Sequence, residues 1–181
     1  MSLTAACLIA VIAAAEPAPV AAVDEAPRVI DYRVVVDAPL DAVWRTWSTN
    51  EGVRTFFAPS SNIEPRVDGA YEILFFPDAE PGRRGAEGMR ILAFDPPRFL
   101  SFTWNAPATI PTIRAQNTIV AIRLTALDDG RTAVRLTHGG WGMGADWDEA
   151  FAYFDAAWRD VVLTRFHRRF AEGPADWTAA D

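Results

Sequence analysis

Apolar and polar residues alternate along much of the chain, which is the pattern of strands that bury one face. In the first run, over residues 30–36, the apolar residues Ile30, Tyr32, Val34 and Val36 alternate with charged residues such as Asp31 and Arg33. Further runs are separated by turn residues such as Asp68-Gly69 and a glycine-rich loop over 82–88, and they predict strands over residues 62–67, 71–76, 89–94, 99–104, 116–127 and 132–138. Strands joined by tight turns pair antiparallel, so the pattern predicts a meandering sheet of about seven strands.

Helical spacing replaces this alternation after the first strand and again toward the C-terminus. Pro39 and the apolar residues after it predict short helices over residues 40–47 and 51–57. Large apolar side chains then recur at spacings of three and four, which predicts a long helix over residues 146–172 with one broad apolar face. Asp146 and Glu149 predict a capping box at its start. The apolar face consists of Trp147, Phe151, Phe154, Trp158, Val162 and Phe166.

Together these elements predict an α+β fold in which a curved antiparallel sheet covers the apolar face of the long C-terminal helix. Alternation predicts that the following sheet residues face the helix: Tyr71, Ile73, Phe75, Leu100, Phe102, Trp104, Val120, Ile122, Leu124, Val134, Leu136 and His138. Large rings in both layers leave two alternatives, a dry core or a cavity between sheet and helix. A cavity would be a small-molecule site, because such sites are apolar with a few polar groups.

Length and charge narrow the function further. With 181 residues, half of them hydrophobic, the chain has the size of one domain. A formal net charge of −7 disfavours nucleic-acid binding, which concentrates Lys and Arg. Cys7 is the only cysteine and there are two histidines, so a zinc site is not expected. We therefore expect neither a metal nor another cofactor.

The N-terminal segment differs from the rest of the chain. Residues 5–15 form an apolar run of signal-peptide length that is too short to span a bilayer, and it ends in small residues, Ala13 to Ala15, that suit a cleavage site. We expect a signal peptide over 1–22, a flexible lead-in over 23–27, a domain over 28–173 and a tail over 174–181. The mature protein would then be periplasmic or secreted, with no integral membrane segment. No Lys or Arg precedes the run, so a cytoplasmic location is the alternative.

Three motifs in a fixed order carry a family resemblance. They are VDAPLDAVW over 36–44, DPPRFLSFTW over 95–104 and VRLTHGGW over 134–141. In these motifs the chain resembles the SRPBCC (START-like) superfamily, and within it the group named for the activator of the heat-shock-protein-90 ATPase. The resemblance covers residues 28–172. It implies a helix-grip fold, often with an apolar cavity, but superfamily members include carriers, cyclases, receptors and co-chaperones, so it does not fix the activity.

The function favoured by these features is non-catalytic binding of a small hydrophobic molecule, a lipid or an aromatic compound. Arg90 and Arg114 are candidates for a ligand carboxylate if they point inward. The glycine-rich segment 140–144 is expected to be a hinge that leads into the helix. The expected ligand-binding residues are Tyr71, Ile73, Phe75, Phe102, Trp104, Val120, His138, Trp141, Trp147, Phe151, Phe154 and Trp158.

Two other functions stay open. One is a cyclase- or hydrolase-like enzyme in which His138 acts as general acid or base with a carboxylate such as Asp148 or Glu72. The structural alternative for His138 is a hydrogen bond to the backbone at the Gly139-Gly140 bend. The other function is a co-chaperone-like interaction protein, if the chain is not exported. The oligomeric state is not predicted.

Overall fold

The computed structural model describes residues 27–178 of the chain. The expected signal peptide and most of the lead-in, together with residues 179–181, lie outside the described residues. The elements in chain order are β1 (Ile30–Val36), α1 (Leu40–Ser48), α2 (Asn50–Val53), β2 (Ser60–Ile63), β3 (Tyr71–Leu74), β4 (Gly85–Ala86), β5 (Ile91–Asp95), β6 (Phe99–Trp104), β7 (Thr118–Ala126), β8 (Thr132–Gly139), α3 (Ala145–Ala156), the π-helical segment η1 (Ala157–Val162) and α4 (Leu163–Ala171).

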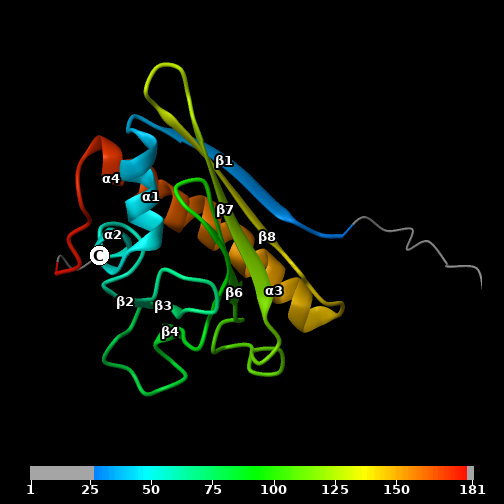
Figure 1. The fold of residues 1–181 in the computed structure, drawn as a ribbon. Coiled ribbons are helices and arrows are strands. Elements are labelled where there is room, and N and C mark those ends of the chain that lie inside the picture. The colour runs from blue at the N-terminus through cyan, green and yellow to red at the C-terminus, as the bar shows by residue number, and fades with distance from the viewer. Residues whose placement is uncertain (1–26, 179–181) are drawn as a thin grey trace, which may run out of the picture.

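The strands form a curved antiparallel sheet with the C-terminal helix lying across it (Figure 1). Five strands follow the order β1-β8-β7-β6-β5, and β2-β3-β4 form a second group. The groups are joined where Ala70 bridges Arg90 and the Tyr71 N–H donates to the Met89 carbonyl at 2.8 Å. The predicted α+β helix-grip fold is confirmed. The structure has one strand more than the seven predicted. This additional strand is β4, which is two residues long and lies within the stretch predicted as a loop.

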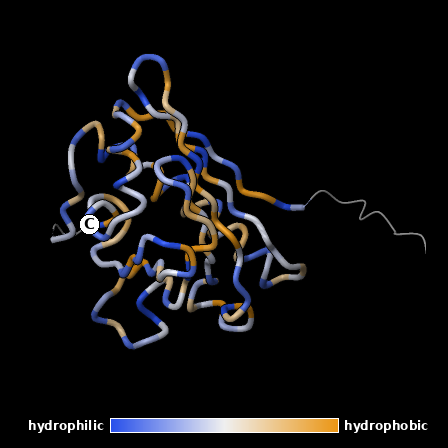
Figure 2. The backbone as a smooth tube through the Cα atoms, viewed as in Figure 1, coloured by the Kyte–Doolittle hydropathy of each residue, from blue (hydrophilic) through white to orange (hydrophobic). Residues whose placement is uncertain are grey.

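Strand register explains why alternation predicts the buried face. Across the five-stranded group, Phe102 pairs with Val120, Val120 with His138, and His138 with Ile30. All four side chains are buried, and together they form one row under the helix. Hydrophilic residues gather at the turns and loops, with hydrophobic residues in the strands between them (Figure 2). The sheet is therefore apolar on the face that the helix covers.

Three local predictions need correction. The strand predicted over 62–67 is β2, which begins at Ser60 and ends at Ile63. The helix predicted over 51–57 is α2, which ends at Val53. The prediction of a capping box is wrong, because no side chain caps the N-terminus of α3. Gly144, with a φ of 105°, is the N-cap, so the helix begins at Ala145 and Asp146 already lies inside its first turn.

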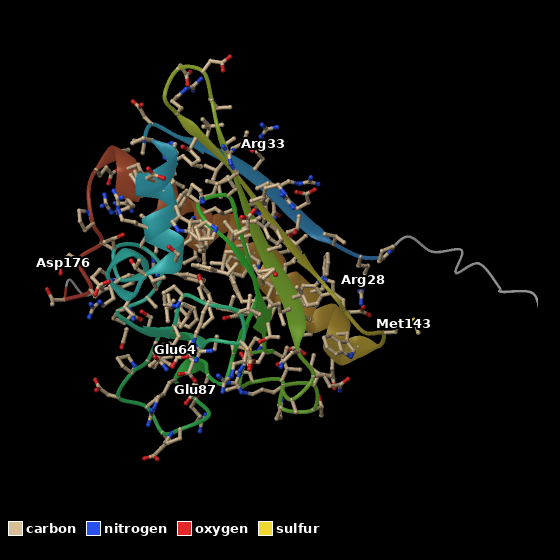
Figure 3. All side chains as sticks on the ribbon, in the orientation of Figure 1. Arg28, Arg33, Glu64, Glu87, Met143 and Asp176 are labelled. Carbon is tan, nitrogen blue, oxygen red and sulfur yellow. The ribbon has the colours of Figure 1, made fainter. Side chains whose placement is uncertain are left out.

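Glycines shape the segment between β8 and α3. A Cβ atom at Gly142 would lie 2.3 Å from Trp147 Nε1, so the indole packs where a side chain would otherwise stand. Gly140 has a φ of 85°, which glycine adopts without strain. At this end of the molecule Arg28 lies beside Met143 (Figure 3), and it donates to the Gly142 carbonyl and pairs with Asp148. Glycine thus lets the chain turn from the last strand onto the sheet face.

The C-terminal helix places an apolar residue on the sheet at every fourth position. In an α-helix four residues turn through about 400°, so such a row drifts by about 40° per repeat. The wider π-helical segment η1 interrupts the α-helix in the middle of this row and offsets the drift. The buried row is Ala150, Phe154, Trp158, Val162 and Phe166.

Candidate functional site

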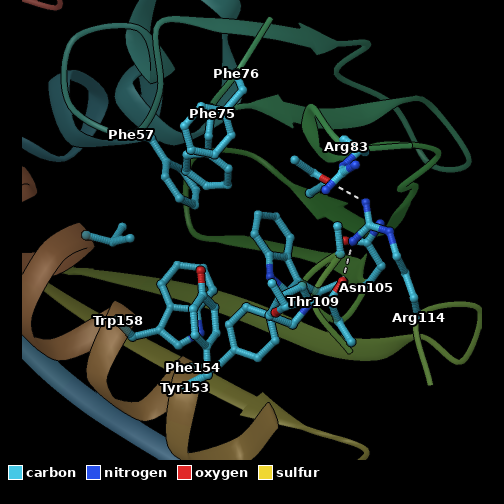
Figure 4. A pocket seen from close by; sticks show the side chains of 17 residues that line it. Phe57, Phe75, Phe76, Arg83, Asn105, Thr109, Arg114, Tyr153, Phe154 and Trp158 are labelled. Carbon is cyan, nitrogen blue, oxygen red and sulfur yellow. Dashed lines mark hydrogen bonds between the residues drawn. The ribbon is translucent and has the colours of Figure 1, made fainter. Parts of the chain in front are cut away.

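A pocket of about 250 Å³ lies where the C-terminal helix passes the ends of β3, β4 and β6. Figure 4 shows aromatic rings on one side of it and polar side chains on the other. Its lining comes from Phe57, Phe75, Phe76, Arg83, Gly85, Ala86, Trp104, Asn105, Ala106, Pro107, Ala108, Thr109, Arg114, Tyr153, Phe154, Trp158 and Val162.

The aromatic side of the pocket is a continuous set of packed rings. Trp104, the last residue of β6, stacks on Phe57 with centroids 5.9 Å apart and an interplanar angle of 14°. Trp158 of the helix lies 5.6 Å from Trp104 and 5.7 Å from Phe57. Phe75, which follows β3, contacts Phe57 edge-on at 5.9 Å. Mutual packing fixes these rings and covers most of their faces, since Phe57, Trp104 and Trp158 are at most 3% exposed. The accessible ring surface of the pocket is that of Phe75 and of the aromatic residues at its mouth.

The polar side is formed by two loops that Arg114 holds together. Its guanidinium donates to the carbonyls of Ala106, Gly82 and Gly85, the last at 2.8 Å. The Ala106 carbonyl belongs to the loop after β6, the Gly82 carbonyl to the loop between β3 and β4, and the Gly85 carbonyl to β4 itself. Arg114 is half-buried and its donors are directed at backbone, so its position in the pocket wall is structural.

The pocket mouth is marked by two exposed aromatic residues. Phe76 is 67% exposed and Tyr153 is 52% exposed, although both line the pocket. Arg83 and Thr109, also exposed, belong to the same rim. These side chains border the opening through which the pocket meets solvent.

His138 lies behind the pocket wall in a directed hydrogen-bond chain. Trp158 Nε1 donates to His138 Nδ1 at 2.9 Å, so Nδ1 is the acceptor and Nε2 carries the proton. His138 Nε2 is 2.7 Å from Thr118 Oγ1, which in turn donates to the Trp104 carbonyl at 2.9 Å. Burial lowers the pKa of His138 to about 3. The ring is therefore neutral, and both of its nitrogens are occupied.

The ring of His138 does not bond to the backbone at the following bend. Instead the His138 carbonyl accepts from Trp141 Nε1 at 3.0 Å, which fixes Trp141 over the imidazole. The carboxylates suggested as its catalytic partners lie elsewhere: Asp148 pairs with Arg28, and Glu72 accepts from Asn62 and Gly88. The proposed acid-base pairs are thus not assembled.

Of the twelve residues expected to bind ligand, the pocket brings together Phe75, Trp104, Phe154 and Trp158. Tyr71, Ile73, Phe102 and Val120 are fully buried in the core between sheet and helix. Trp147 belongs to a smaller cluster with Ala106, Ile110, Ile113 and Ala150. Trp141 and Phe151 pack against each other at the beginning of the helix, with His138 close by.

The pocket-lining residues that strand alternation misses lie in loops and on the solvent-exposed side of the helix. Arg83, Asn105 and Thr109 lie in segments where no periodicity applies. Tyr153 precedes the buried Phe154 and projects from the rim. The sequence did give one indication of these residues. Trp104 was an expected ligand-binding residue at the end of its strand, and the loop that follows it lines the same pocket. Arg90, the other arginine suggested for a ligand carboxylate, donates to the Asp68 carbonyl outside the lining.

Two further findings concern residues 27–178. Within this range no three His, Cys, Asp or Glu side chains gather as a metal site. Nor does any helix there combine the length and the apolar content needed to cross a membrane.

The family model for the Activator of Hsp90 ATPase homolog 1-like protein matches residues 37–171. The chain belongs to this family. The match includes α1, the whole sheet after β1 and all of the C-terminal helix, so the pocket lies within it. The resemblance seen in the three sequence motifs is confirmed. None of the curated proteins matches the chain.

Solved structures with the same fold accompany the family match. Protein MLL2253 from Mesorhizobium loti is 18% identical, with a TM-score of 0.64 over 82% of this chain and 100% of that one. The Aha1 dimer from Colwellia psychrerythraea is 16% identical, with a TM-score of 0.62 over 82% and 99%. An HSP90 activator from Plasmodium falciparum is 12% identical, with a TM-score of 0.57 over 81% and 98%. At these identities the likeness shows the fold alone.

Proposed function

We propose that this member of the family binds a small hydrophobic molecule in the pocket beside the C-terminal helix without transforming it. The observation that carries the proposal is the pocket itself, about 250 Å³ of space between fixed aromatic rings. Protein cores are close-packed and hold few voids larger than a water molecule, so a space of this size is not ordinary core packing. A preformed apolar cavity with a few polar groups at one side is the usual form of a small-molecule site.

The volume favours a small ligand over a membrane lipid. An apolar cavity of roughly 150 Å³ holds one benzene molecule. A pocket of about 250 Å³ accordingly suits a bicyclic aromatic compound or a short chain. Accessible rings such as Phe75 and Tyr153 favour the aromatic compound, because offset stacking adds to the burial of apolar surface.

The pocket supports binding better than acid-base catalysis. Its described lining offers three titratable side chains, Arg83, Arg114 and Tyr153, and none of them is a carboxylate or an imidazole. His138 is separated from the space by Trp158 and holds its proton on the nitrogen that faces Thr118. An enzyme in this cavity would lack the usual proton acceptor of neutral pH.

Isothermal titration calorimetry with a neutral bicyclic probe, 2-naphthaleneethanol, tests the proposal. We expect saturable one-to-one binding. Ala108→Trp should abolish it, because Ala108 is exposed on the rim and an indole there fills the mouth. Ala126→Trp adds the same side chain to an exposed strand position outside the lining and should leave binding intact. Absence of binding to the wild-type protein, across a set of mono- and bicyclic compounds, would reject the proposal.

A second candidate function is stimulation of an Hsp90 ATPase, supported by the description of the family. It is tested by adding the purified protein to an Hsp90 and measuring ATP hydrolysis. Ala108→Trp separates the two functions, since it blocks the pocket and leaves other surfaces unchanged.

We also propose export to the periplasm, on the apolar run over residues 5–15. Cell fractionation followed by N-terminal sequencing tests it. A processed N-terminus in the envelope fraction is expected, and an intact Met1 in the cytoplasmic fraction contradicts it.

A further inference from the structure

Charge is distributed unevenly in the pocket lining. The chain has 24 acidic and 17 basic residues, all of the latter arginine. Two of these arginines, Arg83 and Arg114, line the pocket, and no Asp or Glu does. An excess of positive charge at an apolar cavity, in a chain with a net charge of −7, favours an anionic ligand.

The two arginines have different roles. Arg114 donates to three backbone carbonyls, so its hydrogen-bonding capacity is largely used. Among the described residues, the guanidinium of Arg83 makes neither a hydrogen bond nor an ion pair. A free guanidinium presents a planar fork of donors that matches a carboxylate. Arg83 is therefore the group with donors available for a ligand.

The loop that carries Arg83 is fixed around it. The Arg83 N–H donates to the Glu80 carbonyl at 3.0 Å, which closes a turn. Glu87 accepts from the backbone N–H groups of Gly82 and Arg84 at 2.9 and 3.0 Å. Arg114 ties the same loop to the opposite wall. The backbone of Arg83 is thus held at the rim, while its side chain stays unpaired.

The aromatic rings and Arg83 lie on opposite sides of the space (Figure 4). Phe57, Trp104 and Trp158 close the apolar side, and Arg83 and Asn105 border the other. A ligand that fills the pocket with its ring system consequently directs its free end toward Arg83. The pocket is amphipathic, and its occupant should be amphipathic in the same direction.

We propose that the ligand is a small aromatic carboxylate whose ring system packs against the accessible aromatic rings of the pocket and whose carboxylate accepts hydrogen bonds from Arg83. This inference rests on the proposed binding function. A singly charged carboxylate fits better than a phosphate, because a dianion needs more donors than one guanidinium supplies and those of Arg114 are engaged. A charge-assisted bidentate pair at the rim then selects the acid over neutral compounds of the same shape.

Calorimetric titration with two compounds that share one ring system tests the inference. 2-Naphthaleneacetate carries the carboxylate and 2-naphthaleneacetamide is its neutral counterpart. We expect the acid to bind about tenfold more tightly than the amide at low salt. In Arg83→Gln this preference should fall to about twofold or less, because the acid loses more affinity than the amide. Arg98→Gln, which removes an exposed arginine outside the lining that has no side-chain hydrogen bond or ion pair within residues 27–178, should keep the wild-type preference.

The outcomes separate the inference from the function on which it rests. If acid and amide bind equally and Arg83→Gln changes neither affinity, the pocket binds hydrophobic molecules but the carboxylate inference is overturned. If neither compound binds, the proposed function fails first. The preference for the acid should also decline as the salt concentration rises, because Arg83 is exposed and the interaction is screened. Thermal unfolding and circular dichroism of Arg83→Gln should match the wild-type protein, which keeps a loss of preference attributable to the guanidinium.

Discussion

At the scale of single residues, His138 shows how burial turns a candidate catalyst into part of the core. The directed chain from Trp158 through His138 and Thr118 to the Trp104 carbonyl requires a neutral imidazole. Protonation would add a second hydrogen to the ring, on Nδ1, which already accepts the hydrogen bond from Trp158. The same chain ties the helix to β7 and β8 directly behind the pocket. Its role is to hold two of the pocket's tryptophans in place.

This burial predicts that stability falls with pH in mildly acidic solution. The folded pKa of His138 is about 3, against an unperturbed value of 6.5. Between these values the unfolded chain binds a proton that the folded chain refuses, so stability is full above pH 6.5 and is lost as the pH falls toward 3. Between pH 7 and pH 5 the contribution amounts to about 2 kcal/mol. Urea unfolding at the two pH values measures it.

His138→Gln removes this titration and should flatten the difference between pH 7 and pH 5, although the variant starts from a lower stability. His167→Gln removes the other histidine, which is exposed on α4, and controls for substitution as such. An unchanged pH dependence in His138→Gln would show that other groups cause the acid sensitivity.

Arg114 is the other residue whose effect follows directly from its contacts. Arg114→Gln loses the hydrogen bonds that join the loop after β6 to β4 and the loop before it. We expect a loss of about 1 to 3 kcal/mol in stability and faster amide hydrogen exchange over residues 82–88 and 105–109. Arg90→Gln, which breaks one exposed bond to the Asp68 carbonyl, is the matched control. Equal exchange in both variants would show that the hydrogen bonds of Arg114 do not hold the two segments together.

At the scale of elements, periodicity located most of the fold. The strand over 99–104 has the bounds of β6, and the helix over 40–47 differs from α1 by one residue. Both segments combine a clear apolar period with a proline or turn residue at one end. The errors fall where local bonding decides, as in α2, where the Thr49 side chain caps a helix of four residues. Such a helix buries too little for periodicity to detect.

The π-helical segment was beyond prediction because the apolar spacing of the helix fits an α-helix almost as well. It yields a test through deletions. Removing Val161, an exposed residue of η1, lets the wide turn close into an α-helix without rotating either flank. Removing the exposed Ala152 of α3 rotates the first turns of the helix by about 100° and takes Trp147 and Ala150 off their cluster.

We therefore expect the Ala152 deletion to cost about 3 kcal/mol or more, by analogy with removal of a large buried side chain, and the Val161 deletion to cost clearly less. Urea unfolding of both variants measures the difference. A Val161 deletion as damaging as the other would mean that the wide turn does not absorb a residue.

At the scale of the whole molecule, the fold and the site differ in how far the sequence determines them. Structures 12 to 22% identical to this chain share its fold, because many apolar residues satisfy the same alternation. The pocket depends instead on loops whose conformation is fixed by individual contacts, such as those of Arg114. For this reason the sequence pointed to Trp104, Phe154 and Trp158 on the elements but not to Arg83 or Asn105.

The last described residues, 174–178, contact a segment that lies more than a hundred residues earlier in the chain. The Ala175 N–H donates to the Thr55 carbonyl at 2.8 Å, and Trp177 Nε1 donates to the Arg54 carbonyl at 2.6 Å. The guanidinium of Arg165 lies over the Trp177 ring, 5.2 Å from its centroid. Residues 174–178 are therefore packed against the segment that leads to Phe57 in the pocket wall.

Truncation after Gly173 should consequently lower the free energy of unfolding by about 2 kcal/mol, from two lost hydrogen bonds and one cation–π contact. Truncation after Thr178 keeps all three contacts and controls for shortening of the chain. Trp177→Ala should reproduce most of the loss, because it removes the indole donor and the ring together while the Ala175 bond stays. Differential scanning calorimetry of the three variants distinguishes these cases. If truncation after Gly173 leaves the unfolding temperature unchanged, the contacts with Arg54 and Thr55 do not stabilise the domain, and the pocket wall at Phe57 is supported by its ring packing alone.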